Sequence, residues 1–335
     1  MVASPDYTVD GTGTQGPDAQ SLVASAYRKT LAPNAPGAIE AGDVIIMLDE
    51  ELHATLSPLV QAAQEEFWVQ NDDQTLVANQ YSYTIPQRAS FANWRDVVYV
   101  DANGNEINLT NLSPEYLKLT YPAGGNPPLY TFGFILQNDK IILWPPNGGV
   151  PTQYSLRMKI KRRPNNLTSV DNCAQVVSID TVTKIVTCST VPSDWTSALT
   201  IDVIPNRPQF TSLQDDGTIT AVTTGASGTV TFSTLPTDSL GNYTMQAGDW
   251  ICPATMSPIP QIPYDMFPLL AQRGALRILE SLGDTQNLQV AERRYQDMAA
   301  DFARTVSPRI EGTPKKIVNR NTPPYWGSYG FPFQR

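Results

Sequence analysis

Histidine and cysteine are scarce in this chain, and both shortages narrow the chemistry open to it. The one histidine among 335 residues, His53, falls within a predicted helix, so a helix-surface or packing role is the simplest interpretation. The three cysteines form no CxxC pair and no zinc-binding spacing. Cys173 and Cys188 could face each other across a hairpin centred near Asp180. Three free thiols in a reducing cytoplasm is the favoured interpretation.

Several motifs of nucleotide-binding and hydrolytic sites are also missing. The chain has no P-loop, no GxSxG nucleophile turn and no HExxH metal motif. The adjacent acids Glu50-Glu51 and Glu65-Glu66 lie on predicted helices, where neighbouring side chains point about 100° apart. Neither pair can therefore flank one glycosidic bond. We expect no catalytic residue, no cofactor and no bound metal, and therefore a protein that is not an enzyme.

Charge is sparse, and it is unbalanced towards acids. Charged residues make up 16% of the chain, against roughly 25% in typical soluble proteins. The net charge of −9 opposes a main role in gripping nucleic acid, because phosphate binding needs a basic face. No apolar run approaches the roughly 20 residues that span a membrane, and the polar, Gly-rich start predicts no secretory signal. Polar residues and 28 prolines suit a packed assembly.

Helical periodicity occurs near both ends of the chain. Apolar residues at spacings of three and four predict helices over about 19–31 and 41–56, and Ser57 resembles the N-cap of a third helix. The same spacing recurs over 264–282 and again from Asp284 or Thr285. Gly283 is placed as a C-terminal cap between these last two helices, which predicts an antiparallel helical hairpin.

Between the helical ends the apolar period changes to two. Alternation begins near Leu76, and Asn103-Gly104 gives a strong hairpin signal between two candidate strands. Residues 165–256 are rich in Thr, Val and Ser and contain six short candidate strands, as in a small barrel or sandwich. The N- and C-terminal helices each have one apolar face and no partner within their own segment, so we expect them to pack together.

The resulting prediction is an α+β fold: an antiparallel helical bundle built from N- and C-terminal helices, with inserted antiparallel β regions and an extended C-terminal arm. The predicted divisions are a flexible N-terminal arm (1–18), the helical bundle (19–75 and 257–306), a β-rich region (76–164), an inserted small β-barrel or β-sandwich (165–256) and the C-terminal arm (307–335).

The C-terminal arm has a composition of its own. It combines five prolines with basic and aromatic residues against one acid, Glu311. Proline opposes helix, and exposed aromatic side chains are costly in water, so we favour an arm that becomes ordered on another protein over a satellite core on its own subunit. The residues expected to dock are Arg309, Lys315, Lys316, Arg320, Tyr325, Trp326, Tyr329, Phe331 and Phe333.

A second candidate contact is a basic strand. Arg157, Lys159 and Lys161 alternate along a predicted strand and so share one face. Such a face could contact DNA or an acidic protein ring. The alternative is a protected edge strand, because lysines on an edge discourage aggregation.

Taken in order, several segments resemble the head-to-tail adaptor proteins of tailed phages, especially the short-tailed type. They are "MLDEELHATLSPLVQAAQEEFW" (47–68), "NQYSYTIP" (79–86), "VVYVDANGNEINL" (97–109), "SPEYLKL" (113–119), "LYTFGFILQNDKIILWPP" (129–146), "AGDWICPATMSPIPQIPYDMFPLLAQRGALRILESLGD" (247–284) and "SPRIEGTPKKIVNR" (307–320).

The resemblance implies a structural subunit of the virion neck, made in the host cytoplasm. About twelve copies would form a ring beneath the portal protein, in contact with tail or nozzle proteins, and genomic DNA would pass through without sequence-specific binding or membrane contact. The C-terminal arm would reach onto the portal.

One alternative stays open: a receptor- or carbohydrate-binding tail component with 165–256 as its binding module, favoured by Trp195 and Trp250 in a Thr/Ser-rich β block.

Overall fold

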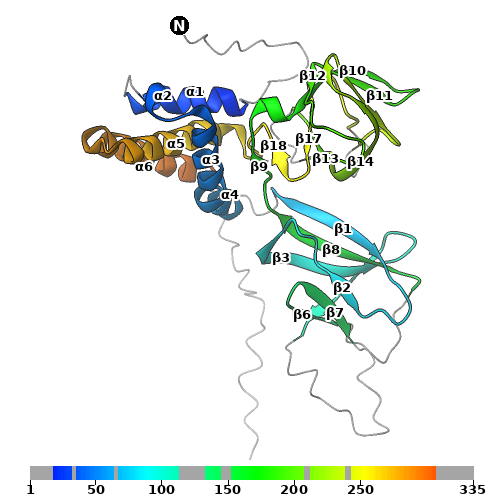
Figure 1. Ribbon diagram of the computed structural model, residues 1–335. Helices are drawn as coiled ribbons and strands as arrows, with labels where there is room; N and C mark the ends of the chain where they lie inside the picture. Colours follow the sequence, from blue (N-terminus) through cyan, green and yellow to red (C-terminus); the bar gives the residue numbers. More distant parts are fainter. Residues whose placement is uncertain are drawn as a thin grey trace, which may run out of the picture.

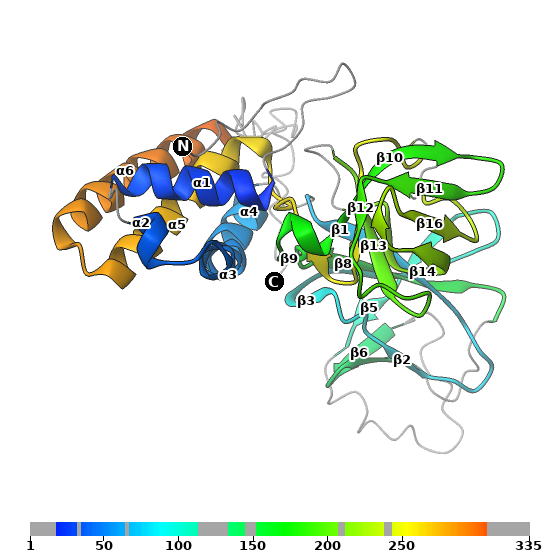
Figure 2. The same ribbon diagram turned by 45° about the horizontal axis from the view of Figure 1, so that its top comes forward.

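The computed structural model describes residues 18–31, 35–63, 67–112, 133–144, 152–206, 212–237 and 243–306. A layer of helices occupies one end of the molecule, and a β-barrel and two small sheets lie beside one another at the other end (Figures 1 and 2). The segment SPEYLKL (113–119) and nearly all of both predicted arms lie outside the described residues.

The helical layer combines segments from both ends of the described chain. Helix α5 contacts α1, α3 and α6, and Gly283 ends α5 in a left-handed conformation with φ of 68°, as the predicted hairpin requires. Asp18 caps α1 by accepting a hydrogen bond from the Ser21 N–H. The helices are α1 (Ala19–Thr30), α2 (Ala35–Ala38), α3 (Ala41–Glu51), α4 (Ser57–Ala63), α5 (Phe267–Leu282) and α6 (Thr285–Val306).

The predicted N-cap at Ser57 is wrong, because α3 continues into α4 through a π-helical turn, Leu52–Leu56. Ser57 has helical backbone angles, and its N–H bonds to the carbonyl oxygen of Leu52, five residues earlier. Pro58 lacks an N–H group and would normally interrupt the helical hydrogen bonding here. The wider turn carries the helix past this position.

Two four-stranded sheets lie below the helices in Figure 1. The first has the order β1-β8-β3-β4, and the second has the order β2-β7-β6-β5. Leu156, Met158 and Ile160 alternate along β8 and bury one face of the first sheet. The bounds are β1 (Val69–Thr75), β2 (Ser82–Thr84), β3 (Ala89–Val100), β4 (Glu106–Asn108), β5 (Thr110–Asn111), β6 (Gly133–Gln137), β7 (Lys140–Trp144) and β8 (Ser155–Arg162).

The third β unit is a closed barrel with the strand order β10-β11-β16-β14-β13-β17. Its interior is filled by aliphatic side chains such as Val186, Ile201, Val230 and Ile251, all fully buried. The strands are β10 (Ala174–Asp180), β11 (Ile185–Cys188), β13 (Thr200–Ile204), β14 (Gln214–Thr223), β16 (Thr229–Phe232) and β17 (Trp250–Pro253), with short flanking strands β9 (Asn166–Leu167), β12 (Thr190–Val191), β15 (Gly225–Ala226) and β18 (Met256–Ser257).

The predicted fold class, a helical bundle with inserted β regions, is wrong. The described chain is 36% strand and 33% helix and contains a closed six-stranded antiparallel barrel. The physical reason lies in the main core, where helical residues such as Leu48 and Phe267 pack together with Ile204, Trp250 and Cys252 of the barrel strands. The outer wall of the barrel therefore supplies part of the apolar surface that the helices cover, and other helices supply another part. None of the described helices is long and apolar enough to cross a membrane.

Candidate functional site

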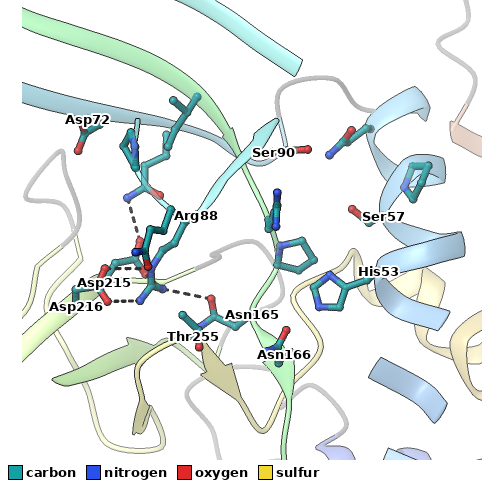
Figure 3. A pocket seen from close by; sticks show the side chains of 18 residues that line it. His53, Ser57, Asp72, Arg88, Ser90, Asn165, Asn166, Asp215, Asp216 and Thr255 are labelled. Carbon is teal, nitrogen blue, oxygen red and sulfur yellow. Dashed lines mark hydrogen bonds and ion pairs between the residues drawn. The ribbon is translucent and has the colours of Figure 1, made fainter. Parts of the chain in front are cut away.

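A polar cleft of about 1150 Å³ opens where the helices, the first sheet and the barrel meet (Figure 3). His53 and Ser57 reach it from the α3–α4 segment, Asp72 from β1, and Arg88 from the turn before β3. Asp215 and Asp216 of β14 line the barrel side. Side chains from the helices, the first sheet and the barrel thus line one common space (Figure 3).

Arg88 is the centre of a charged network at the base of this cleft. Its Nη1 and Nη2 donate to the two carboxylate oxygens of Asp202 at 2.6 and 2.8 Å, a bidentate pair. Nη1 also donates to Asp215 at 3.0 Å, and Nη2 to Asp216 at 2.7 Å. Burial alone would lower the pKa of Arg88, but the hydrogen bonds that it donates to Asp202 and Asp216 raise this pKa overall. The guanidinium therefore stays charged.

Asp202 is fully buried and satisfies its charge through five hydrogen bonds. Besides the two from Arg88, it accepts from Asn165 Nδ2 at 2.7 Å and from the backbone N–H groups of Thr255 and Asp216 at 2.9 and 3.0 Å. A carboxylate in the interior is tolerated only with such partners. One strand residue of the barrel is thus bound to the turn before β3 and to the segment that leaves β8.

Arg162, at the end of β8, is the second cation of the network and is 1% exposed. Its Nη2 donates to Asp215 at 2.6 Å and to Asn165 Oδ1 at 2.7 Å. Burial lowers the pKa of Arg162, and Asp215 opposes that shift. Its Nε and Nη1 atoms have no hydrogen-bond partner among the described residues. Removing Asp215 would therefore leave a buried guanidinium with little compensation.

The network has the chemistry of a junction between modules. Three carboxylates converge on one position, which elsewhere would suit a cation, but here the Arg88 guanidinium occupies it. No group of three or more His, Cys, Asp or Glu side chains could hold a metal ion within the described ranges. Breaking a buried ion pair by removing one partner costs about 3–5 kcal/mol, which makes this junction resistant to opening.

His53 lies on the opposite wall of the cleft, facing the same space as Ser57 (Figure 3). Its Nε2 is 3.5 Å from Asp49 Oδ1, and that carboxylate oxygen already accepts the Leu167 N–H at 2.6 Å. No hydrogen bond joins His53 to Ser57 or Ser90 in the part of the chain that the structure describes. His53 and Asp49 thus sit where the helices meet β9, and no activated serine is formed there.

The basic strand predicted as a contact is β8, and two of its three cations, Arg157 and Lys159, pair with acids on neighbouring strands. Arg157 Nε donates to Asp73 on β1 at 2.7 Å, and Arg157 Nη1 and Lys159 Nζ both contact Glu106 on β4. Lys161 is 8% exposed. The edge-strand alternative is wrong, because β8 lies between β1 and β3.

The other predicted contact residues lie outside the described residues. These are Arg309, Lys315, Lys316, Arg320, Tyr325, Trp326, Tyr329, Phe331 and Phe333.

Sequence reasoning missed Arg88, Asp202 and Asp215. One signal was present for Asp202, which stands between Ile201 and Val203 in an apolar strand. A charged side chain at such a position is either buried with a partner or placed at a β-bulge. Nothing local pointed to Arg88 as its partner, because 114 positions separate the two residues.

No protein-family model and no curated protein matches this chain.

Proposed function

We propose that this chain is a structural subunit of the neck of a tailed-phage particle. In this proposal, copies form an adaptor ring that joins the portal to the tail and surrounds the DNA passage. The observation that carries it is the buried Arg88–Asp202 junction together with the shared core of helices and barrel. A ring that transmits load between head and tail needs modules with fixed relative orientations, and this junction supplies them within each subunit.

The charge distribution supports the same proposal. Arg157 and Lys159 of the basic strand β8 pair with Asp73 and Glu106, and Lys161 is 8% exposed, so the strand offers little free positive charge to a DNA backbone. A channel wall must let DNA slide, and unpaired cations would retain it through counterion release. We therefore expect a passage whose lining is neutral or acidic.

Mixing the purified chain with the portal ring of the same particle tests the proposal. We expect a stable complex with about twelve copies in a closed ring, visible by electron microscopy. A variant lacking residues 307–335 should keep the thermal midpoint of the free subunit and lose portal attachment. A chain that stays monomeric with the portal present, with its junction intact, would contradict the adaptor role.

The receptor- or carbohydrate-binding alternative keeps one supporting feature, the polar cleft lined by amides and hydroxyls. The two tryptophans that favoured it, Trp195 and Trp250, are each 5% exposed, so neither offers a free ring face for stacking on a sugar. Saturable binding of purified host-surface glycan to the isolated chain, without binding to the portal, would favour this alternative.

A further inference from the structure

Two of the three cysteines face each other across the strand pair that closes the barrel. Strands β10 and β17 are antiparallel, with Ala174 opposite Ile251 and Gln175 opposite Trp250. Cys173 precedes Ala174 and Cys252 follows Ile251, so this register sets the two cysteines directly opposite each other. The Cys252 thiol interacts with that of Cys173. Directly opposed residues bring their β-carbons within the reach of a disulfide when the pair is of the close, non-hydrogen-bonded type.

The hydrogen bonding around the pair indicates the close type. The Val176 N–H donates to the Asp249 carbonyl oxygen, so Val176 and Asp249 belong to the hydrogen-bonded set. Pairs alternate between the two types along an antiparallel ladder. Positions 174 and 251 are therefore also of the hydrogen-bonded type, and 173 and 252 are of the closer type.

The third cysteine has a different environment. Cys188 lies opposite Val176 on β11 and belongs to the barrel interior, whereas Cys173 and Cys252 belong to the core shared with the helices. A Cys173–Cys188 bridge, which the hairpin pattern left open, would join residues of two different cores. All three thiols are free and buried.

We propose that Cys173 and Cys252 are a modification site, a latent disulfide that ties the first strand of the barrel to its last. The co-reactant is a small disulfide such as oxidised glutathione. One thiolate attacks a glutathione sulfur and releases reduced glutathione, which leaves a mixed disulfide on the chain. The second thiolate then displaces the remaining glutathione. Two thiols and one oxidised glutathione thus become one protein disulfide and two reduced glutathiones.

The position of the bridge explains what it would stabilise. It would close a loop over residues 174–251, which contains all of the barrel strands except the end of β17. The seam itself has two paired positions, Ala174–Ile251 and Gln175–Trp250. A long closed loop limits the unfolded chain strongly. Burial raises the pKa of the Cys252 thiol, so few thiolates form while the seam is closed. Oxidation should therefore follow transient opening of the seam.

Peptide mapping of the full chain tests the proposal directly. We expect incubation with a glutathione redox buffer to produce a Cys173–Cys252 cross-linked peptide, with Cys188 alkylated only after denaturation. Low urea should accelerate the reaction several-fold by opening the seam. The oxidised chain should melt higher by on the order of 5–10 °C, and this gain should vanish on reduction.

Matched variants separate this pair from general thiol reactivity. Cys188→Ala should keep the cross-link and the thermal shift, and Cys173→Ala should lose both while folding normally in reducing buffer. A cross-link that includes Cys188 would overturn the proposal. The proposal would also be overturned if all three thiols of the wild-type chain could still be alkylated after prolonged oxidation in low urea. This result does not depend on how any variant folds.

Discussion

Among individual residues, Asp202 is the fully buried carboxylate of the junction. It binds Arg88, Asn165 and two backbone N–H groups. In Asp202→Asn an NH₂ group replaces one carboxylate oxygen, so a hydrogen-bond donor would face the N–H donors that now bind that oxygen. The substitution also removes the negative charge that balances Arg88. We expect Asp202→Asn to lower the free energy of unfolding by about 3–5 kcal/mol, measured by urea denaturation.

Asp216 provides the matched control, because it contacts the same guanidinium from an exposed position. Its side chain is 60% exposed, and its ion pair with Arg88 Nη2 spans 2.7 Å. Exposed ion pairs contribute about 0–1 kcal/mol, so Asp216→Asn should change stability by less than that. Equal losses from the two substitutions would show that burial of Asp202 is not what makes the junction strong.

Glu51 makes the stability of the helical layer depend on pH. It is 1% exposed and accepts hydrogen bonds from Arg273 Nε at 2.7 Å, Arg277 Nε at 2.6 Å and Thr55 Oγ1 at 2.8 Å. Burial raises the pKa of Glu51, but the bonds from Arg273, Thr55 and Arg277 outweigh it and lower the pKa below the ordinary 4.5. The folded state therefore binds this proton less readily than the unfolded state does.

The sign of the pH effect follows from this shift. A carboxyl whose pKa is depressed on folding adds stability above its unfolded pKa and loses it as the pH falls through the folded one. We expect the free energy of unfolding of the wild-type chain to fall more steeply below about pH 4.5 than that of the Glu51→Gln variant. At pH 7 the variant should be less stable than the wild type by about 2–3 kcal/mol. Urea midpoints at several pH values measure both. Parallel pH profiles would rule out a role for Glu51.

At the scale of elements, local patterns predicted most strands and helices of the described chain. All six strands expected in 165–256 are confirmed as barrel strands, and the hairpin of α5 and α6 is confirmed with Gly283 as its cap. Alternation and capping are local signals, so they can be read without knowing the neighbours. The place of β8 inside its sheet could not be read, because strand order depends on pairing between segments far apart in sequence.

Gly274 lets α5 pack closely against α3 and α1. A β-carbon there would lie 2.6 Å from Leu48 Cδ2 and 3.3 Å from Ala26 Cβ, and Leu48 is fully buried. The clash should exceed the gain in helix propensity, so we expect Gly274→Ala to destabilise the chain by about 1–2 kcal/mol. Gly42→Ala, in the first turn of α3, is the control, since a β-carbon at that position would meet no atom within 4 Å and the substitution should be neutral or slightly stabilising. Thermal or urea melts of the two variants measure the difference, and a stabilised Gly274→Ala variant would contradict this packing.

At the scale of the whole molecule, the division of the chain into cores differs from its division by pattern. The sequence pattern predicts that the segment 165–256 is a self-contained insertion. The core inside its barrel consists only of residues from this segment. Its outer wall is not self-contained, since Leu167, Cys173, Ile204, Trp250 and Cys252 share a core with the helices. Periodicity shows that a strand has two faces, but it does not show which distant element covers the outer one.

This shared core changes what removal of the barrel should do. If 165–256 were an independent insertion, as the sequence pattern suggests, replacing it with a short Gly/Ser loop would leave a helical protein that melts cooperatively. The structure now argues for the opposite outcome, because the replacement would leave Arg88 and the 1%-exposed Arg162 without their carboxylates and would expose the helical side of the main core. We expect an aggregated product without a cooperative transition, measured by circular dichroism and size-exclusion chromatography. Adding Arg88→Met and Arg162→Met removes the orphaned charges, and because the exposed core remains, solubility should recover only in part. A monomeric, cooperatively melting product from the loop replacement alone would show that the helices and sheets fold independently of the barrel.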